Sequence, residues 1–354
     1  MEITILGYIL LPLGLWAFLQ KSWKFLFQVF IFFVPFSASA VINLPTFGIQ
    51  PAIYLGFLII SRIILGLTLK AINNKKIAKI SNKQILVLSL FWIFIVAALL
   101  SILTIPFVGT VIVSRPSGDN GILRIGVENF TQLIYLVYFI TFVTIISLCK
   151  LEEIDLKEVL FVFTISSIFV CIWGWIQITM YKVGIQYPDF LFNNNNSGAQ
   201  SYGQVIKSVS IKRMNSVLQE PSRMARFMVV PTFIYLYQII YKPDLIFKQK
   251  YISLILSIIF SFTLFATTSS TAYVSFGFGV LFLIFLMIWK NIYAININPK
   301  EIRRAFVVSL GYIIGFLSVL LLVMQILDLG IQDIVELLDV VLFNKIDSNS
   351  AEGR

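Results

Sequence analysis

YISLILSIIFSFTLFATTSSTAYVSFGFGVLFLIFLMIW, residues 251–289, contains no charged side chain. The polar tripeptide TSS, 268–270, divides it into two apolar stretches, 251–267 and 271–289. A helix needs about 20 apolar residues to cross the hydrocarbon core of a bilayer, and a tripeptide connection is too short to have structure of its own. The sequence therefore predicts two transmembrane helices joined as a tight hairpin.

Apolar stretches of similar length recur along the rest of the chain. Only Glu2 precedes the first of them, without a basic segment or a small-residue cleavage site, so this stretch is interpreted as a retained span. With the hairpin, these stretches predict an all-α fold, a polytopic membrane helical bundle of about ten transmembrane helices. The further predicted spans are 3–19, 25–44, 50–69, 85–105, 130–149, 157–181, 224–241 and 305–327.

The overall composition also indicates a membrane protein. Hydrophobic residues make up 58% and charged residues 12% of the chain, whereas soluble domains carry about 45–50% apolar and about 25% charged residues. The absence of histidine excludes a histidine metal site or a Ser-His-Asp triad within these residues. Cys149 and Cys171 both lie in apolar stretches and are expected to be buried thiols.

The basic residues are distributed loop by loop, which argues against nucleic-acid binding and predicts the orientation of the chain. Five alternate loops hold 16 basic side chains, whereas the N-terminal end and the turns at 45–49 and 268–270 hold none. Because cytoplasmic loops carry the excess of basic residues, the N-terminus is predicted to lie on the outer side of the membrane. The predicted inner loops are 20–24, 70–84, 150–156 with the start of the next helix, 242–250 and 290–304.

The chain is expected to form one integral membrane domain, 1–354, without a separate soluble domain. Its predicted outer segments include a long loop at 182–223 and the start of a second loop at 328–354. Within the first loop, NNNNSGAQSYG at 193–203 is polar and turn-rich and is expected to form a flexible tip.

Arginines in the outer segments run against the charge bias. Arg124 precedes the span 130–149, and Arg354 ends the chain. One explanation is that long loops are translocated regardless of charge, with Asp119 and Glu128 as partners of Arg124. The other explanation is that these arginines hold an anion at the outer face, and the residues alone leave both explanations open.

The segment KRMNSVLQEPSRMARFM, 212–228, joins the long outer loop to an apolar helix. Pro221 suits the first turn of a helix, where its missing N–H costs nothing. A helix is therefore predicted to begin near Pro221, with Glu220 at its cap. Arg223 and Arg226 are three residues apart and share one side of its first turns.

This helix start has the properties of an anion site. Free backbone N–H groups and the helix dipole favour an anion there, and Arg213 approaches from the preceding loop with a guanidinium suited to phosphate. Alternatively, Glu220 only caps the helix and the arginines anchor it at lipid headgroups. Arg226 favours the anion site, because an ionisable group inside an apolar segment is costly unless it faces a partner or a wet cavity.

These features resemble the O-antigen polymerase and ligase superfamily, which includes the Wzy-type capsule and exopolysaccharide polymerases. FATTSSTAYVSF, 265–276, is similar to the family's small-residue hairpin, and DSNSAEGR, 347–354, to the S-x-x-x-R stretch of its large outer loop. In layout the resemblance covers nearly the whole chain. Its main motif, R-x-x-S-x-x-x-E-P-S at the start of a span, corresponds to Arg213, Ser216, Glu220, Pro221 and Ser222.

The chain departs from the family pattern in several ways. The family hairpin often carries an arginine after its serine, where this chain has Ser270 and Thr271. Arg223 and Arg226 fall at variable positions of the motif, so their assignment rests on the local physical argument alone. Further spans usually follow the large outer loop, and the chain is therefore expected to be truncated at its C-terminal end.

The resemblance implies a GT-C-like, metal-independent glycosyltransferase without a cofactor. It would polymerise undecaprenyl-diphosphate-linked oligosaccharide repeat units for O-antigen, capsule or exopolysaccharide, at the outer face of the inner membrane. The implied partners are the lipid-linked oligosaccharide, membrane lipids and a chain-length regulator protein. Without a metal, arginines and helix N-termini must meet the charge that grows on the leaving diphosphate.

This chemistry assigns roles to particular residues. Glu220 and Arg213 are the predicted catalytic residues, with Glu220 either taking the proton of the acceptor hydroxyl or orienting Arg213. Glu352 is a second candidate base. The predicted ligands of the substrate diphosphate are Arg213, Arg223, Arg226, Arg124 and Arg354.

Two other functions stay open, an O-antigen ligase of the same superfamily and a transporter or flippase of lipid-linked glycans. The family's ligases use a histidine in the large outer loop, and these residues contain none. A flippase would expose charge along a cavity through many helices, whereas the intramembrane charges here are Arg62 and Arg226. Arg62 is expected either to extend toward the inner interface or to take part in a site.

Overall fold

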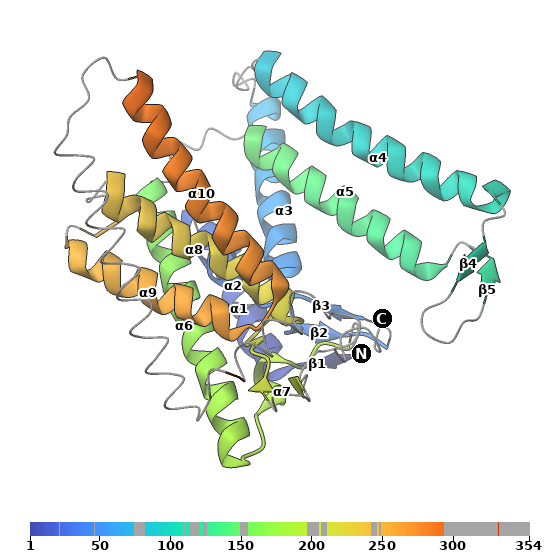
Figure 1. Ribbon diagram of the computed structural model, residues 1–354. Helices are drawn as coiled ribbons and strands as arrows, with labels where there is room; N and C mark the ends of the chain where they lie inside the picture. Colours follow the sequence, from blue (N-terminus) through green and yellow to red (C-terminus); the bar gives the residue numbers. More distant parts are fainter. Residues whose placement is uncertain are drawn as a thin grey trace. The chain divides into compact units, whose positions relative to one another are not determined.

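The structure, a computed structural model, is mostly helical, with several very short strands (Figure 1). The described part of the chain comprises residues 1–20, 22–45, 47–73, 82–108, 111–113, 120–122, 126–148, 155–196, 205–206, 211–241, 246–247, 249–293 and 332.

The chain divides into two compact units. The first contains Met1–Leu13, Gln28–Tyr54 and the described residues from Leu156 onward. The second contains Gly14–Phe27 and Leu55–Asp155. Each unit is considered by itself.

Eight helices lie where the sequence predicts membrane spans, and their ends agree with the predicted ones within a few residues. The predicted span 305–327 lies outside the described residues. The eight helices are α1 (Ile5–Leu19), α3 (Pro51–Ile72), α4 (Asn82–Val108), α5 (Val127–Leu148), α6 (Leu156–Val183), α8 (Pro221–Tyr241), α9 (Lys250–Ala266) and α10 (Ser270–Tyr293).

The prediction of a continuous span over 25–44 is wrong. Helix α2 covers only Lys24–Phe33, and at 1.5 Å per residue it is about 15 Å long, half the thickness of the hydrocarbon core. Pro35 follows, and proline disfavours the helical conformation of the residue before it. The chain then turns into a small antiparallel sheet of β1 (Glu2–Ile3), β2 (Ile42–Asn43) and β3 (Gly48–Ile49).

Three helices in the described part of the chain are long and apolar enough to cross a membrane, by length and composition. They comprise Pro51–Leu69 of α3, Asn129–Ser147 of α5 and Leu156–Val183, which is α6. Helix α8 is not one of them, and Arg226 and Gln238 interrupt its apolar sequence. Shorter apolar helices cover Ile5–Leu19, Lys24–Phe33, Leu88–Thr104, Lys250–Ala266 and Ser270–Leu283.

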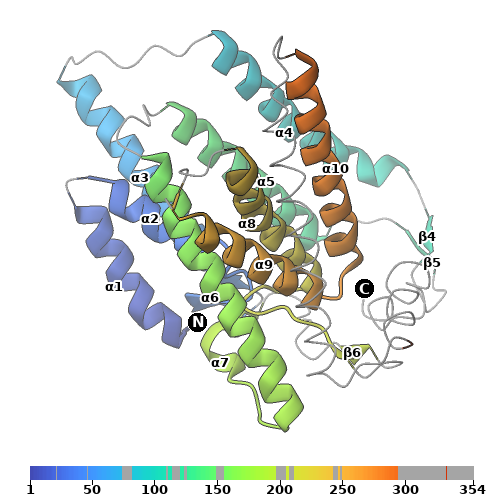
Figure 2. The same cartoon turned by 60° about the vertical axis from the view of Figure 1, so that its left-hand side comes forward.

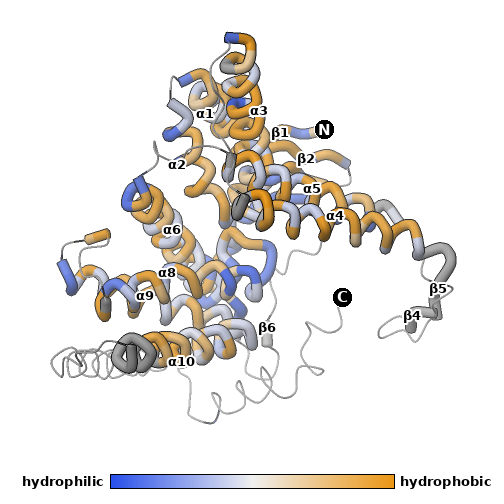
Figure 3. Tube along the Cα trace, turned by 90° about the horizontal axis from the view of Figure 1, so that it is seen from above, coloured by the Kyte–Doolittle hydropathy of each residue, from blue (hydrophilic) through white to orange (hydrophobic). Residues whose placement is uncertain are grey.

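The second unit contains α4 and α5, which pack against each other, and a hairpin of β4 (Val111–Val113) and β5 (Asn120–Ile122). Hydrophobic residues recur along both helices (Figure 3). Trp92, Ile93 and Phe94 are consecutive, so they point to different sides of α4, and all three are exposed. This helix is apolar around much of its circumference.

Arg62 of α3 has a structural role in the second unit. Its Nη2 donates a hydrogen bond of 2.8 Å to the carbonyl of Gln20, just after α1 ends, and its guanidinium lies 5.8 Å from the centre of the Phe18 ring. A cation at a helix C-terminus is favoured by the helix dipole. The Arg62 side chain thus extends to the end of a neighbouring helix, and its extension toward the inner interface or its part in a site stays a prediction.

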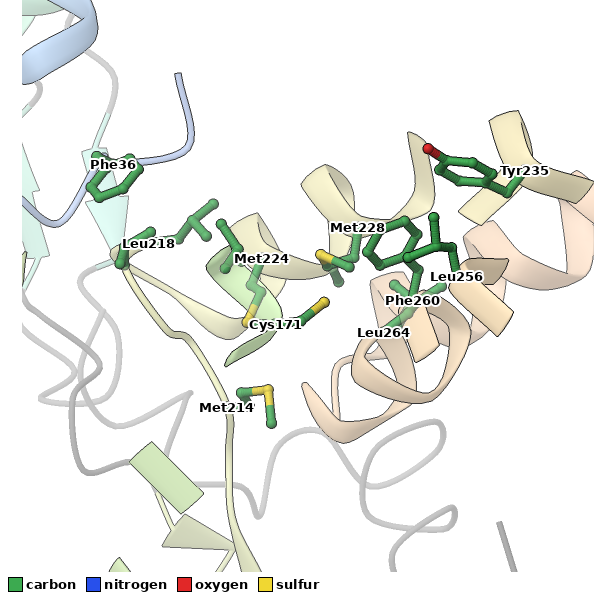
Figure 4. Packing of buried hydrophobic residues seen from close by; sticks show 14 residues of the cluster. Phe36, Cys171, Met214, Leu218, Met224, Met228, Tyr235, Leu256, Phe260 and Leu264 are labelled. Carbon is green, nitrogen blue, oxygen red and sulfur yellow. The ribbon is translucent and has the colours of Figure 1, made fainter. Parts of the chain in front are cut away.

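In the first unit, α6, α8, α9 and α10 surround the main hydrophobic core (Figures 1 and 2). Helices α9 and α10 meet at Thr267–Ser269 and diverge from it, with α8 packed against both (Figure 1). The predicted tight connection is therefore confirmed, but the two helices are separated by α8 along much of their length. Figure 4 shows core residues of α6, α8 and α9, together with Met214 and Leu218 of the loop before α8.

Replacing Arg62 with leucine is expected to destabilise the second unit, because the Gln20 carbonyl loses its charged donor. Hydrogen bonds to charged groups contribute about 1.5–3 kcal/mol. In thermal unfolding of the protein in detergent, Arg62→Leu should unfold at a lower temperature than the wild type, with Arg62→Lys between them. An unchanged midpoint for Arg62→Leu would contradict this role.

Candidate functional site

Two of the segments that carry the resemblance, 212–228 and 265–276, meet in the first unit. The main-chain N–H of Met214 donates a hydrogen bond of 3.4 Å to the carbonyl of Ala266, the last residue of α9. Arg213, the residue before Met214, lies near enough to Tyr273 in the first turn of α10 for a Coulombic interaction. The segment that carries Arg213 and the hairpin connection thus form one site, although about 50 residues separate them in sequence.

Helix α8 begins at Pro221, as predicted. The carbonyl of Glu220 accepts hydrogen bonds from the main-chain N–H groups of Arg223, at 3.0 Å, and Met224, at 3.1 Å. The Glu220 carboxylate accepts a hydrogen bond of 2.9 Å from the hydroxyl of Ser222. Glu220 therefore stands at the start of the helix, as the sequence predicts, and is half-buried there.

Arg223 and Arg226 share the exposed face of α8. Arg223 Nη1 donates to the Gln219 side-chain oxygen, and Arg226 Nε donates to the carbonyl of Ser222 at 3.4 Å. The buried face of the same turns carries Met224, which packs into the core. Arg226 therefore does not face a buried partner, and both guanidinium groups are open to a ligand from outside the unit.

Between Arg213 and Glu220 the chain makes a tight turn, Asn215–Leu218. The N–H of Leu218 donates to the carbonyl of Asn215 at 2.9 Å, and the Asn215 side chain donates to the carbonyl of Leu218 at 2.8 Å. Ser216 has φ of +53°, a left-handed conformation that costs a non-glycine residue about 1–2 kcal/mol. Its hydroxyl donates to the carbonyl of Val170 in α6 at 2.8 Å.

Gln177 of α6 holds this turn through both ends of its side-chain amide. Its oxygen accepts the main-chain N–H groups of Asn215 and Ser216, each at 3.1 Å, and its nitrogen donates to the Asn215 side chain at 2.7 Å. All three residues are fully buried. Since a buried polar group without a partner is costly, this network specifies one position of the turn relative to α6.

Asn193 also holds the turn, and the prediction of a flexible tip is wrong for the four described residues of this segment, 193–196. Asn193 Nδ2 donates to the carbonyl of Ser216 at 2.9 Å, and Tyr187 donates to the other end of the Asn193 amide at 3.0 Å. The Asn194 side-chain oxygen accepts the main-chain N–H of Ala40, and Asn195 donates to the carbonyls of Ser37, Ala38 and Ser39. The Asn43 side chain in turn donates to the carbonyl of Asn194 and accepts the main-chain N–H of Asn196. The rest of the predicted tip, 197–203, lies outside the described residues.

The connection Thr267–Ser269 is buried, and it contains the second strained residue of the site. Thr268 has φ of +46°, which is a genuine outlier for a β-branched side chain. The Thr267 hydroxyl donates to the carbonyl of Leu264 in the last turn of α9 at 2.7 Å, and the Thr268 hydroxyl donates to the carbonyl of Thr267 at 2.9 Å. Strained backbone of this kind is concentrated at functional sites.

Helix α6 presents opposite faces to the site and to a groove. Gly174 lies against the site, where an added Cβ would be 2.7 Å from the sulfur of Met214. The groove, of about 570 Å³, is almost wholly apolar and lies between α6 and α9. It is lined by Ile168, Cys171, Ile172, Trp175, Ile176, Thr179, Met180, Leu256 and Ile259.

Strand β7 (Ile211–Lys212) pairs with β6 (Val205–Ile206) and ends at Lys212, directly before Arg213. The Lys212 ammonium lies 4.9 Å from the centre of the Tyr181 ring, near the end of α6. The side chain is buried, and burial lowers the pKa of Lys212. Lys212 therefore packs against α6 while its neighbour Arg213 reaches the hairpin.

The structure thus joins only part of the predicted site. Arg213 lies at the hairpin and Glu220 at the helix start, while Arg223 and Arg226 lie on the exposed face of α8. The sequence analysis did not single out Gln177 and Asn193, which hold the turn, or Tyr273, which lies near Arg213. The remaining predicted residues, Arg124, Glu352 and Arg354, lie outside the described residues.

Comparisons with protein-family models, with curated proteins and with solved structures find no match to this chain. The residues of the site themselves are therefore the basis for its function.

Substitutions at Ser216 are expected to separate backbone strain from hydrogen bonding. Ser216→Ala loses the bond to Val170, about 0.5–1.5 kcal/mol, and keeps the cost of the left-handed backbone. Ser216→Gly loses the same bond but removes that cost, so it should unfold at a higher temperature than Ser216→Ala in detergent. If Ser216→Gly were less stable than Ser216→Ala, the left-handed backbone at residue 216 would have no energetic cost, which would contradict this prediction.

Proposed function

We propose that this protein is a glycosyltransferase of the bacterial inner membrane that polymerises undecaprenyl-diphosphate-linked oligosaccharide repeat units. Its product would be an O-antigen, a capsule or an exopolysaccharide, and its site would face the outer side of the membrane. Nine of the ten predicted transmembrane spans, all but 25–44, and an outside N-terminus belong to the same proposal.

The membrane location is supported by the apolar surface of the helices. Large apolar side chains are exposed along α4 and α5, including Trp92, Phe94, Phe130 and Phe139. Soluble monomers rarely expose continuous apolar patches larger than a few hundred Å², whereas lipid covers such surfaces at no cost. The loop-by-loop distribution of lysine and arginine supports the orientation.

The observation that carries the proposal is the meeting of the two motif segments. The residue pattern Arg213–Ser222 is the main motif of the resemblance, and the hairpin 265–276 adds a less specific second element. The hydrogen bond from Met214 to Ala266 joins the two segments. Two segments that a family would use in one site are expected to be neighbours, and here they are.

The chemistry follows from the charges of the site. The acceptor hydroxyl attacks the anomeric carbon of the donor glycan, a new glycosidic bond forms, and the bond from that carbon to the diphosphate oxygen breaks. Undecaprenyl diphosphate leaves, and its growing negative charge is met by Arg213, with Arg223 and Arg226 reaching the phosphates from the exposed face of α8. The dipole at the start of α8 acts in the same direction.

Glu220 is the proposed acceptor of the proton released by the attacking hydroxyl. Its position at the start of α8, four residues after Ser216, places a carboxylate next to the arginine-bearing turns of the helix. Its hydrogen bond from Ser222 fixes the orientation of the carboxylate. A positioned base of this kind contributes about 10²–10⁴-fold to the rate.

Complementation of a host strain that lacks this protein tests the proposal. Arg213→Ala and Glu220→Ala are expected to replace long polymer by single repeat units at normal protein levels, since one preorganised donor is worth about 10²–10³-fold in rate. Lys250→Ala, an exposed basic residue at the predicted inner end of α9, is the matched control and should leave the polymer ladder unchanged.

The glycan pattern also separates the alternatives. Long polymer that is made but not attached to its final acceptor would indicate a ligase, and the absence of any repeat unit at the outer face would indicate a flippase. Normal polymer ladders from both Arg213→Ala and Glu220→Ala would contradict the assignment of these two residues to a catalytic site.

A further inference from the structure

The Asn215–Leu218 turn decides where the two proposed catalytic residues stand. Ser216, in the left-handed conformation, lies three residues after Arg213 and four residues before Glu220. On one side of the turn the chain is bound to the hairpin through Met214 and Ala266, and on the other side it enters α8 at Pro221. A change in φ at Ser216 would therefore rotate one side relative to the other.

The local sequence does not favour this conformation. Turns with a positive φ at the second position are dominated by Gly, Asn and Asp, whereas this position is a serine. A strained residue persists only where the surrounding structure imposes its conformation. The restraint must therefore come from outside the turn.

The restraint comes mainly from Gln177, which is fully buried in α6. Its amide oxygen accepts the main-chain N–H of Ser216 itself and that of the residue before it, Asn215. Asn193 binds the carbonyl of Ser216 on the other side. The peptide groups before and after Ser216 are thus both fixed by side chains from other segments.

We propose that Gln177 is a positioning residue of the site: with Asn193 it holds Ser216 in the left-handed conformation, and this sets Arg213 against the hairpin and Glu220 at the start of α8. The inference rests on the proposed function for its catalytic readout, but it also predicts a change in the backbone that is measurable without activity.

The central test compares two buried glutamines. Gln177→Leu removes all three hydrogen bonds to the turn. Gln238→Leu is the matched control, because Gln238 of α8 is equally buried and its amide nitrogen donates to the carbonyl of Phe247, away from the turn. Both variants are purified in detergent and assayed on a lipid-linked repeat unit, with rates normalised to folded protein.

Gln177→Leu is expected to lower kcat by about 10²-fold, because misplacing a catalytic group by about 1 Å has an effect of this size. Gln238→Leu should keep the kcat of the wild type even if it lowers the unfolding temperature as much. Equal kcat for the folded Gln177→Leu and wild-type proteins would overturn the proposal.

A second substitution tests whether Gln177 acts through the turn. Glycine adopts positive φ without strain, so Ser216→Gly added to Gln177→Leu should restore at least about tenfold of the lost kcat. Ser216→Ala in the same background should restore none. Equal results for the two double variants would overturn the proposal, since Gln177 would then act by some route other than the conformation of Ser216.

Hydrogen exchange of the peptide covering 213–220 gives the readout that is independent of activity. Exchange in this peptide should be faster in Gln177→Leu than in Gln238→Leu and the wild type, because two of its amides lose their acceptor. Unchanged exchange would overturn the positioning role alone. Faster exchange together with normal ladders from Arg213→Ala would instead remove the proposed function and leave the structural role of Gln177 in place.

Discussion

The hydrogen bonds from the main-chain N–H groups of Asn215 and Ser216 to the side-chain oxygen of Gln177 are the constraint on which the rest of the site depends. All three residues are buried, so the loss of one bond leaves a polar group without a partner. The network thus ties the loop before α8 to α6, one of the longest helices of the described chain. The position of Arg213 at the hairpin follows from this attachment.

Sequence patterns predicted most of the helices, because long apolar stretches and a well-placed proline are local signals. Pro221 marks the start of α8 for this reason. The predicted span over 25–44 fails at Pro35, where helix α2 has ended. The side chains of Asn194 and Asn195 bind main-chain groups of Ser37, Ser39 and Ala40, and a polar, turn-rich sequence gives no sign of such distant partners.

The sequence indicated charged residues of the candidate site but not the neutral residues that hold it. Arg213 and Glu220 were visible because they flank a helix start that Pro221 marks, where free N–H groups favour an anion, and because they match the main motif of the resemblance. Gln177 is a carboxamide within the apolar stretch 157–181, but a neutral polar group costs less to bury than a charge and is therefore a weaker signal. Tyr273 and Asn193 could not be assigned, because only the fold brings them to the segment 213–220.

The two residues with strained backbone lie on the two segments that meet in the site. Ser216 and Thr268 are the residues other than glycine with positive φ in the described part of the chain. They lie on the two segments that the bond between Met214 and Ala266 joins. A serine in place of glycine at 216 adds a hydroxyl bond to Val170, so the strained residue also anchors the turn to α6. A site built this way holds its charged groups by neutral, buried contacts, which leaves the arginines on α8 available to a ligand.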